Sequence, residues 1–193
     1  MIFKKNVAIS VAIYNAIYNA TFHFRKLRKK STISACAANI GVGLALMNNY
    51  DINIVPFNGE EYYEASDEVE YLKYINSSQD RVSLVINIDS PCHAGSKIAA
   101  SLYNFDDPAK DVLDHLMQTQ NEVVYGTEWY AGDHAAFAFR GIPCMVLSSS
   151  DLFEGGLDNT HTMRDTLDTV DLSQIELAVN FINHTLECMS KTV

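Results

Sequence analysis

A short apolar segment that runs into a glycine turn and two adjacent glutamates constrains the fold most. Residues 52–55 read Ile-Asn-Ile-Val and stop at Pro56, which is the pattern of a short buried β-strand. Glu60 and Glu61 follow the turn, and a helix pattern begins at Glu61. Ligands of open α/β sheets bind at the carboxyl ends of the strands, which is where these two carboxylates are expected.

The two glutamates have two interpretations. Adjacent like charges repel, and burying both costs free energy unless a cation or a proton compensates. In the functional interpretation, one of Glu60 and Glu61 binds a metal and the other stays free as a general base. In the other interpretation, they are the solvated acidic start of a helix, where negative charge interacts favourably with the helix dipole.

Strand and helix patterns alternate along the chain. Strand patterns occupy residues 7–13, 52–55, 82–88 and 144–147, and helix patterns occupy residues 37–47, 61–75, 107–117, 132–139 and a final segment capped at 171–173. This alternation predicts an α/β fold, a three-layer α/β/α sandwich with a mostly parallel central sheet. Because no linker or internal repeat divides the chain, we expect a single domain over residues 1–193.

Charge is distributed unevenly along the 193 residues. Residues 1–50 contain seven Lys and Arg and no acidic residue, whereas residues 51–193 contain the other seven and all 24 acidic residues, a formal charge of −17. The net charge of −10 argues against nucleic acid as a partner, and the basic run at 24–30 is interpreted as a solvated surface. An acid-free basic N-terminus is also the composition of a transit peptide, which stays an alternative for this region.

The sequence favours a cytoplasmic protein that does not enter membranes. The apolar stretch at residues 6–20 is too short, and too interrupted by Asn, to span a bilayer. Cys36, Cys92, Cys144 and Cys188 are widely separated and form no CxxC pair. The spacing indicates neither a zinc knuckle nor a disulfide framework, so we expect reduced and mostly buried thiols.

Two further polar residues occupy positions where a site could form. Asp89 comes directly after the strand pattern at 82–88, and His161 lies in the polar loop 159–162. Together with Glu61, these side chains could share one edge of the sheet. A lone histidine in a polar loop is more often exposed and idle, so the functional interpretation depends on the segments taken together.

Four segments form a combined pattern. They read Phe-Asn-Gly-Glu-Glu-Tyr-Tyr at 57–63, Val-Ile-Asn-Ile-Asp at 85–89, Gly-Asp-His-Ala-Ala-Phe at 132–137 with Gly-Ile-Pro at 141–143, and His-Thr at 161–162 with Asp-Thr-Leu-Asp at 165–168. In order and spacing, over about residues 52–187, the chain resembles the co-catalytic zinc aminopeptidase family of bacterial leucyl aminopeptidases and their glutaminyl cyclase relatives. Residues 1–35 are divergent and basic, and match this family poorly.

The resemblance implies a zinc-exopeptidase fold and a role for several side chains. Glu60 matches the general base, Glu61 and His161 match ligands of one zinc ion, and Asp89 matches a ligand of the other. The adjacent pair Asp133–His134 would lie near the pocket for a peptide or small amine. Carboxylates with neutral imidazole suit zinc, and a zinc-bound water of lowered pKa would attack the scissile carbonyl of the peptide.

The N-terminal part departs from the family at positions that normally bind metal. The first histidine ligand corresponds to Ala12, a supporting aspartate corresponds to Tyr14, and the aspartate that bridges both metals falls on Ala37 or Ala38. Alanine cannot bind a metal, so the one or two zinc ions of the family would be held weakly or lost. The alternatives are an aminopeptidase with a weakened site, an inactive protein that binds a peptide or amine on the same fold, and a decayed product.

Overall fold

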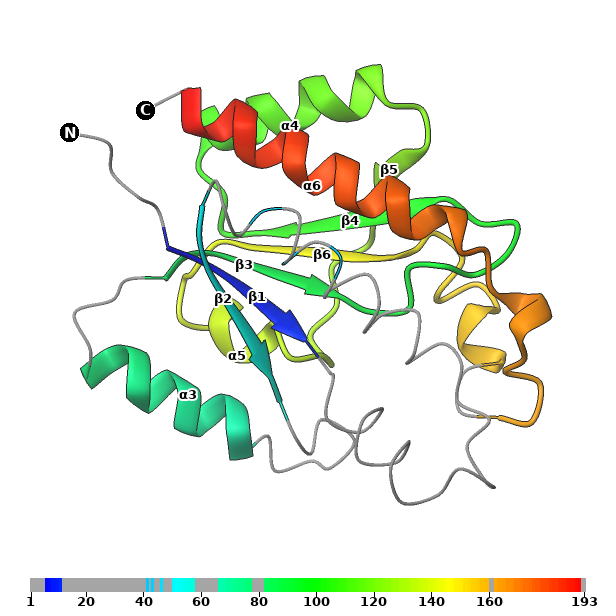
Figure 1. Cartoon of the computed structure of the whole chain (residues 1–193), viewed down its shortest axis with the longest axis horizontal. Helices are drawn as coiled ribbons and strands as arrows, with labels where there is room; N and C mark the ends of the chain where they lie inside the picture. Colours follow the sequence, from blue (N-terminus) through cyan, green and yellow to red (C-terminus); the bar gives the residue numbers. More distant parts are fainter. Residues whose placement is uncertain are drawn as a thin grey trace.

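The computed structural model describes residues 6–11, 41, 43, 46, 50–57, 66–77, 82–159 and 162–191. The strands in this part of the chain are β1 (Asn6–Val11), β2 (Asp51–Pro56), β3 (Val82–Ile88), β4 (Ile98–Tyr103), β5 (Val123–Tyr125) and β6 (Cys144–Ser149). The helices are α3 (Ser66–Ser77), α4 (Asp107–Thr119), α5 (Ala135–Ala138) and α6 (Ser173–Lys191), with the short 3-10 helices η1 (Gly156–Asp158) and η2 (Leu167–Thr169) before α6 (Figure 1).

The strands form one mixed sheet in the order β2-β1-β3-β6-β4-β5. The first four strands in this order run parallel, β4 runs antiparallel to β6, and β5 runs parallel to β4. Val85 of β3 is opposite Cys144 of β6, and Ile98 of β4 is opposite Ser149. The predicted α/β fold with a mostly parallel central sheet is therefore confirmed.

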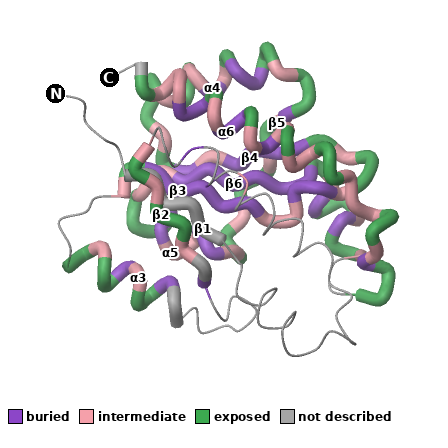
Figure 2. Tube along the Cα trace, viewed as in Figure 1, coloured by how far each residue is buried: buried purple, intermediate pink, exposed green. Residues whose placement is uncertain are grey.

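The central strands are buried on both faces of the sheet. Successive side chains of a strand point to opposite faces. In β3, Ile86 belongs to one buried cluster and Val85 to the other, and in β6 the same holds for Met145 and Val146. Figure 2 shows β3, β4 and β6 as a continuous buried centre. Such runs of apolar residues are typical of parallel strands that are covered from both sides.

Helices cover the two faces as two pairs. The side chains of Leu113 in α4 and Phe181 in α6 lie in the cluster that contains Ile86. Leu72 in α3 and Phe137 in α5 lie in the opposite cluster. Figure 1 shows α4 and α6 above the sheet and α3 and α5 below it. The three-layer α/β/α arrangement expected from the sequence is thus confirmed.

Some elements differ from the sequence pattern. β4 reads Ile-Ala-Ala-Ser-Leu-Tyr and lacks the run of β-branched residues that indicates a strand, whereas β5 reads Val-Val-Tyr and is too short to be recognised. β4 is nevertheless buried along almost its whole length. In the helix predicted at 37–47, residues 41, 43 and 46 are helical and the others lie outside the described residues. The beginning of the helix predicted from Glu61 also lies outside them.

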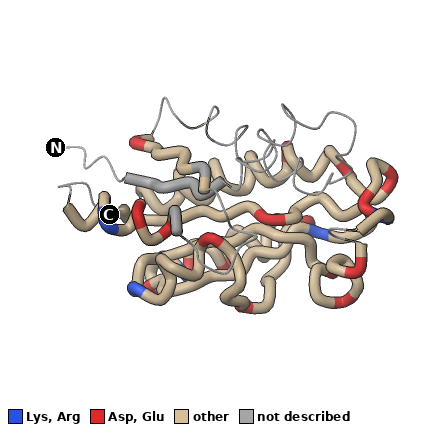
Figure 3. The backbone as a smooth tube through the Cα atoms, turned by 90° about the horizontal axis from the view of Figure 1, so that it is seen from below, with Lys and Arg blue, Asp and Glu red and all other residues tan. Residues whose placement is uncertain are grey.

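Charged and thiol side chains are distributed over the described part of the chain as follows. Acidic residues recur on both sides of the sheet along the described chain, and basic residues are fewer (Figure 3). Among the described residues, Cys92 and Cys144 are buried, Cys188 is half-buried, and these three cysteines are not joined in disulfides. None of the helices among the described residues combines the length and the apolar character that crossing a bilayer requires.

Candidate functional site

The carboxyl ends of β1, β2, β3 and β6 lie at one edge of the sheet because these strands are parallel. Asp89 follows β3 at this edge, and its backbone N–H donates to the carbonyl of Leu147 (2.9 Å). Ser90 has a φ of 51°, which is uncommon for a residue other than glycine, and its hydroxyl donates to Asp89 Oδ1 (3.3 Å). Asp89 is therefore a half-buried carboxylate at the edge where such sheets bind ligands.

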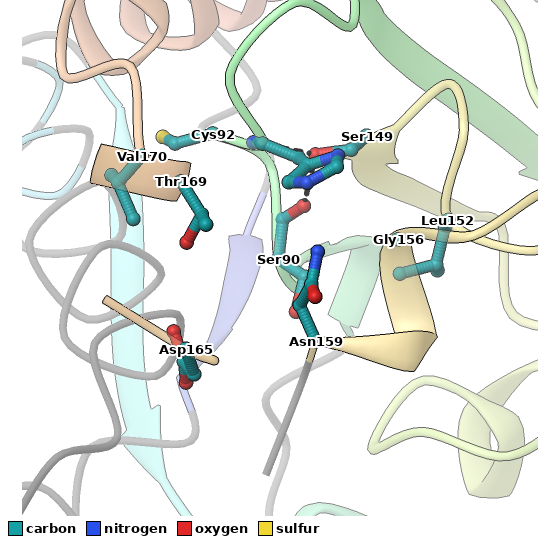
Figure 4. A pocket seen from close by; sticks show the side chains of 10 residues that line it. Ser90, Cys92, Ser149, Leu152, Gly156, Asn159, Asp165, Thr169 and Val170 are labelled. Atoms are coloured by element: carbon teal, nitrogen blue, oxygen red, sulfur yellow. Dashed lines mark hydrogen bonds between the residues drawn. The ribbon is translucent and has the colours of Figure 1, made fainter. Parts of the chain in front are cut away.

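A pocket of about 30 Å³ lies beside Asp89 at this edge. Three loop segments form its wall, one after β3, one after β6 and one before α6. Its lining residues are Ser90, Cys92, His93, Ser149, Leu152, Gly156, Asn159, Asp165, Thr169 and Val170. In Figure 4, Ser90 and Asn159 lie near the centre, Asp165 and Thr169 on one side, and Leu152 and Gly156 on the other. A volume of this size holds one or two small groups, because a single water needs about 10–15 Å³ measured in this way.

Backbone hydrogen bonds fix the loop after β3 in the pocket wall. His93 forms an antiparallel bridge with Val170, and the N–H of Ala94 donates to the carbonyl of Thr169 (2.9 Å). The backbone N–H of His93 donates to Ser149 Oγ (2.9 Å). The loops after β3 and β6 and the segment before α6 are therefore joined at His93.

The imidazole of His93 is oriented by a carboxylate. Its Nδ1 lies 2.5 Å from Oδ2 of Asp151, which is in the loop after β6. Because an ionised carboxylate can only accept, Nδ1 carries the proton of this hydrogen bond. A histidine held in this way by Asp or Glu is the arrangement that proteins use to fix the tautomer of a functional imidazole.

His134 is enclosed by polar and aromatic neighbours. Its Nε2 lies 2.8 Å from the carbonyl of Trp129, and its Nδ1 lies 3.3 Å from Nδ2 of Asn87 in β3. The side chain has no exposed surface, and this burial lowers the pKa of His134 below its ordinary value. The ring is therefore neutral, with Nε2–H donating to Trp129 and Nδ1 accepting from Asn87.

Tyr103 holds the loop that contains Trp129. Its hydroxyl donates to the Trp129 carbonyl (2.6 Å) and accepts from the Trp129 N–H (2.7 Å). Burial raises the pKa of Tyr103 to about 12, so the hydroxyl stays protonated at neutral pH. The ring centroids of Tyr103 and Trp129 each lie 4.9 Å from that of His134. The imidazole of His134 is consequently fixed by two hydrogen bonds and by the rings of Tyr103 and Trp129.

The residues predicted from the sequence are partly described. Asp89 lies at the carboxyl edge, and Asp133 and His134 are buried at the start of α5. The roles predicted for these three side chains remain predictions. The other predicted site residues lie outside the described residues: Glu60, Glu61 and His161, and the alanines at Ala12, Ala37 and Ala38.

Within the described ranges, no three His, Cys, Asp or Glu side chains are close enough to hold a metal ion together. Asp89 is the single predicted metal ligand in this part of the chain. A structural zinc site has four protein ligands and a catalytic one usually has three, so the described residues alone do not form either kind.

The pair of His93 and Asp151 is a feature that the sequence pattern does not reveal. The two residues are 58 positions apart, and neither belongs to a segment of the combined pattern. Their positions after β3 and β6 are the only available signal, because these strands are neighbours in the sheet and end at the same edge. A sequence does not give the strand order that makes them adjacent.

A mostly parallel sheet between two helical layers, with polar side chains at its carboxyl edge, defines a three-layer α/β protein. The chain belongs to peptidase family M28, whose family model matches residues 34–185. The suspected membership of the zinc aminopeptidase and glutaminyl cyclase group is thereby confirmed. No curated protein matches the chain.

Solved structures have the same fold. LapA from Legionella pneumophila, an aminopeptidase, is 14% identical, with a TM-score of 0.72 over 98% of this chain and 54% of its own. BSAP, a zinc aminopeptidase from Bacillus subtilis, is 11% identical, with a TM-score of 0.61 over 94% of this chain and 45% of its own. A glutaminyl cyclase from an Acidobacteriales bacterium is 16% identical, with a TM-score of 0.71 over 97% and 70%. The chain spans about half the length of the two aminopeptidases.

Proposed function

We propose that the chain is a metal-dependent peptidase of the M28 type that releases N-terminal residues from peptides. The observation that carries this proposal is the family match over residues 34–185, which includes β3 and Asp89 at the carboxyl edge. Aminopeptidases among the similar structures support the reaction class. Because sequence identities of 11 to 16% show the fold alone, the substrate and activity rest on the family and on the matched residues.

In this proposal, four side chains perform the chemistry. Glu61 and His161 would hold one zinc ion, and Asp89 would bind the other. Zinc would polarise the scissile carbonyl and lower the pKa of a bound water. Glu60 would accept the proton of that water and return it to the leaving amine. Asp133 and the neutral His134 would shape the wall of the substrate pocket, since Asn87 and Trp129 fix the His134 ring.

The test is a joint measurement of metal content and turnover on the full chain. We expect dialysis against trace zinc to leave bound metal, which is lost in Glu61→Ala and in His161→Ala. Aminoacyl anilides should then be hydrolysed with zinc or cobalt. Glu60→Gln should keep the metal and lower the rate by about 10²–10⁴-fold. Glu70→Gln is the matched control, because Glu70 lies exposed on α3 and is paired with Lys73.

Variants that restore the missing ligand residues would show whether the proposal is wrong. Ala12→His combined with Ala38→Asp, and the same pair with Ala37→Asp, restore the two ligand types that the family has at these positions. If the folded wild-type chain and both repaired chains hydrolyse no aminoacyl anilide in the presence of zinc, the chain is not a peptidase of this type.

A second candidate is a binding protein without hydrolytic activity. It is favoured by the alanines at Ala12 and at Ala37 or Ala38, where the family has metal ligands. Such a protein would hold a peptide amine or another small amine at its acidic edge, and Asp89→Ala would abolish the affinity. Binding of an N-terminally free peptide that is unchanged by zinc and by chelator would support this candidate. Binding that requires zinc would exclude it.

We also infer a cytoplasmic location, supported by Cys92, Cys144 and Cys188, described cysteines that are not in disulfides. Fractionation of the cells that produce the protein would test it. Recovery of the chain in the membrane or secreted fraction would exclude this location.

A further inference from the structure

The backbone of Ser90 has a conformation that its own sequence does not favour. Its φ is 51°, in the left-handed region that residues other than glycine seldom adopt. Ser90 also precedes Pro91, and a residue before proline prefers extended backbone. Such a conformation persists only where the surrounding structure holds it, and it is found most often at functional sites. The hydrogen bonds of Ser90 therefore show what fixes the backbone next to Asp89.

Ser149, the last residue of β6, supplies two of these hydrogen bonds. Its backbone N–H donates to the Ser90 carbonyl at 3.0 Å, and its hydroxyl donates to the same carbonyl at 2.5 Å. The hydroxyl oxygen in turn accepts from the backbone N–H of His93 at 2.9 Å. Ser149 is only 2% exposed, so these hydrogen bonds are shielded from water. One buried hydroxyl thus binds the loop after β3 at two points (Figure 4).

The pairing of β3 with β6 shifts by one residue at Asp89. Ile88 is opposite Leu147, and the N–H of Asp89 donates to the Leu147 carbonyl at 2.9 Å. A regular parallel ladder would continue with the N–H of Ser149 bound to the carbonyl of Asp89. In this structure it is bound to the carbonyl of Ser90 instead. The chain therefore leaves the regular strand geometry at Asp89, and the turn at Ser90 sets the direction of the Asp89 side chain.

His93 is anchored by contacts other than the one to Ser149. Its Nδ1 lies 2.5 Å from Asp151 Oδ2, and its backbone forms an antiparallel bridge with Val170. The N–H of His93 is thereby kept in place as a donor to Ser149 Oγ. A hydroxyl has one proton to donate. Because the Ser149 oxygen accepts from His93, its own proton is directed to the Ser90 carbonyl.

From these contacts we propose that Ser149 is a positioning residue for Asp89. Its hydroxyl holds Ser90 in the left-handed conformation, and this turn sets the direction in which the Asp89 carboxylate leaves the backbone. The hydroxyl of Ser90 donates to Asp89 Oδ1 at 3.3 Å and continues the same chain of contacts to the carboxylate. Ser149 lies 60 residues after Asp89 and belongs to no segment of the combined pattern, so the sequence does not indicate this role.

The inference deepens the proposed function and rests on it in one respect, the role of Asp89 in hydrolysis. The conformation of the Asp89 side chain is a property of the chain itself and can be measured without metal or substrate. A test of this conformation and a test of turnover therefore separate the positioning role of Ser149 from the peptidase proposal.

The first test is NMR on the full chain in the presence of a chelator. Side-chain scalar couplings should show one χ1 rotamer of Asp89 in the wild type and a mixture of rotamers in Ser149→Ala. The amide proton of His93 should exchange about tenfold faster in Ser149→Ala, because its acceptor is lost. Ser149→Thr keeps a hydroxyl and can place its methyl group in the pocket that Ser149 lines, so it should restore both signals.

Ser101→Ala is the matched control. Ser101 is 1% exposed, and its hydroxyl donates to the carbonyl of Thr127 at 2.7 Å. The control therefore also removes a buried hydroxyl from a loop carbonyl, but neither Ser101 nor Thr127 belongs to the loop after β3. It should leave the Asp89 rotamer unchanged. Equal mixing of rotamers in Ser149→Ala and Ser101→Ala would reflect a general loosening of the fold and would overturn the proposal.

The second test measures the turnover of aminoacyl anilides with zinc. Ser149→Ala should lower kcat by about tenfold or more with KM little changed, because a misplacement of about 1 Å can cost about 10²-fold in rate. Ser149→Thr should recover the rate, and Ser101→Ala should keep it. A lower kcat in Ser149→Ala with an unchanged Asp89 rotamer would exclude positioning through Asp89. Absence of turnover in the wild type would contradict the peptidase proposal, and the NMR comparison would then decide the role of Ser149.

Should Ser149→Ala not fold, the wild type and Ser149→Thr decide. A single Asp89 rotamer and a protected His93 amide in both chains would support the proposal. A mixture of Asp89 rotamers in the wild type, or an unprotected His93 amide, would overturn it.

Discussion

His134 has to stay neutral in the folded protein. Both ring nitrogens are used, Nε2 as a donor to the Trp129 carbonyl and Nδ1 as an acceptor from Asn87, and the side chain has no exposed surface. A proton on Nδ1 would meet the N–H of Asn87 and would place a charge in the interior. Burial accordingly lowers the pKa of His134 below 6.5.

The pH dependence of stability follows from this lowered pKa. Below pH 6.5 the unfolded chain takes up a proton at His134 that the folded chain does not, so the free energy of unfolding falls as pH falls. The slope for one proton reaches about 1.4 kcal/mol per pH unit. In His134→Gln, urea unfolding between pH 7.5 and 5 should show a shallower loss than in the wild type. His115→Gln is the control, because His115 is exposed on α4. Parallel pH profiles of wild type and His134→Gln would contradict the assignment.

The sequence predicts the position of some site residues in the fold, but not the contacts of others. Asp89 is predictable because a strand pattern ends directly before it, and the structure places it at the carboxyl edge. His93 and Asp151 meet only because β3 and β6 are neighbours, which no local pattern encodes. The ring of His134 likewise contacts Tyr103 in β4 and Trp129 in the loop before α5, and no local pattern encodes these contacts. Local sequence thus gives the position of a side chain along the chain, and tertiary pairing gives its partners.

Among the elements, α4 has the clearest start signal. The side chain of Asp106 accepts from the N–H of Ala109 (3.0 Å), and Pro108 occupies the first turn, where its missing N–H costs nothing. Asp106→Ala should lower the free energy of unfolding by about 1 kcal/mol, as measured by chemical denaturation. Asp111→Ala removes the same charge from the exposed face of α4 and should change stability by less than about 0.5 kcal/mol. Equal effects of the two substitutions would mean that the cap contributes nothing.

The sequence predicts helices and parallel strands better than it predicts β4 and β5. α4 and α6 have apolar residues at helical spacing and polar caps, and β3 has a continuous apolar run. β4 is a strand because of its tertiary position: Ala99, Ala100 and Ser101 have little strand preference of their own and pair with β6. β5 has three residues and depends on β4 in turn. Elements that need a neighbour in order to form cannot be found from their own residues.

At the scale of the whole molecule, stability should be greatest in the middle of the sheet. β3 has strands on both sides, β6 has strands on both sides, and most of their residues are buried on both faces. α3 is largely exposed, with Leu72 as a buried contact and Tyr74 at 59% exposure. Native-state hydrogen exchange should therefore be slowest in β3 and β6 and close to the rate of global unfolding. Amides of α3 should exchange faster through local opening. Equal protection of α3 and β6 would show that the helix unfolds only with the whole domain.

The sheet order has a consequence for synthesis on the ribosome. Among the described strands, β1 comes before β2 and β3 in the sequence, yet it lies between them in the sheet, and β3 in turn completes its pairing with β6. The two partners of β1 are thus encoded about 45 and 75 residues after it, and β6, which pairs with β3, is encoded about 60 residues after β3. Until β6 has left the exit tunnel, β3 lacks one of its two neighbours, so its apolar side chains are exposed to aggregation during synthesis.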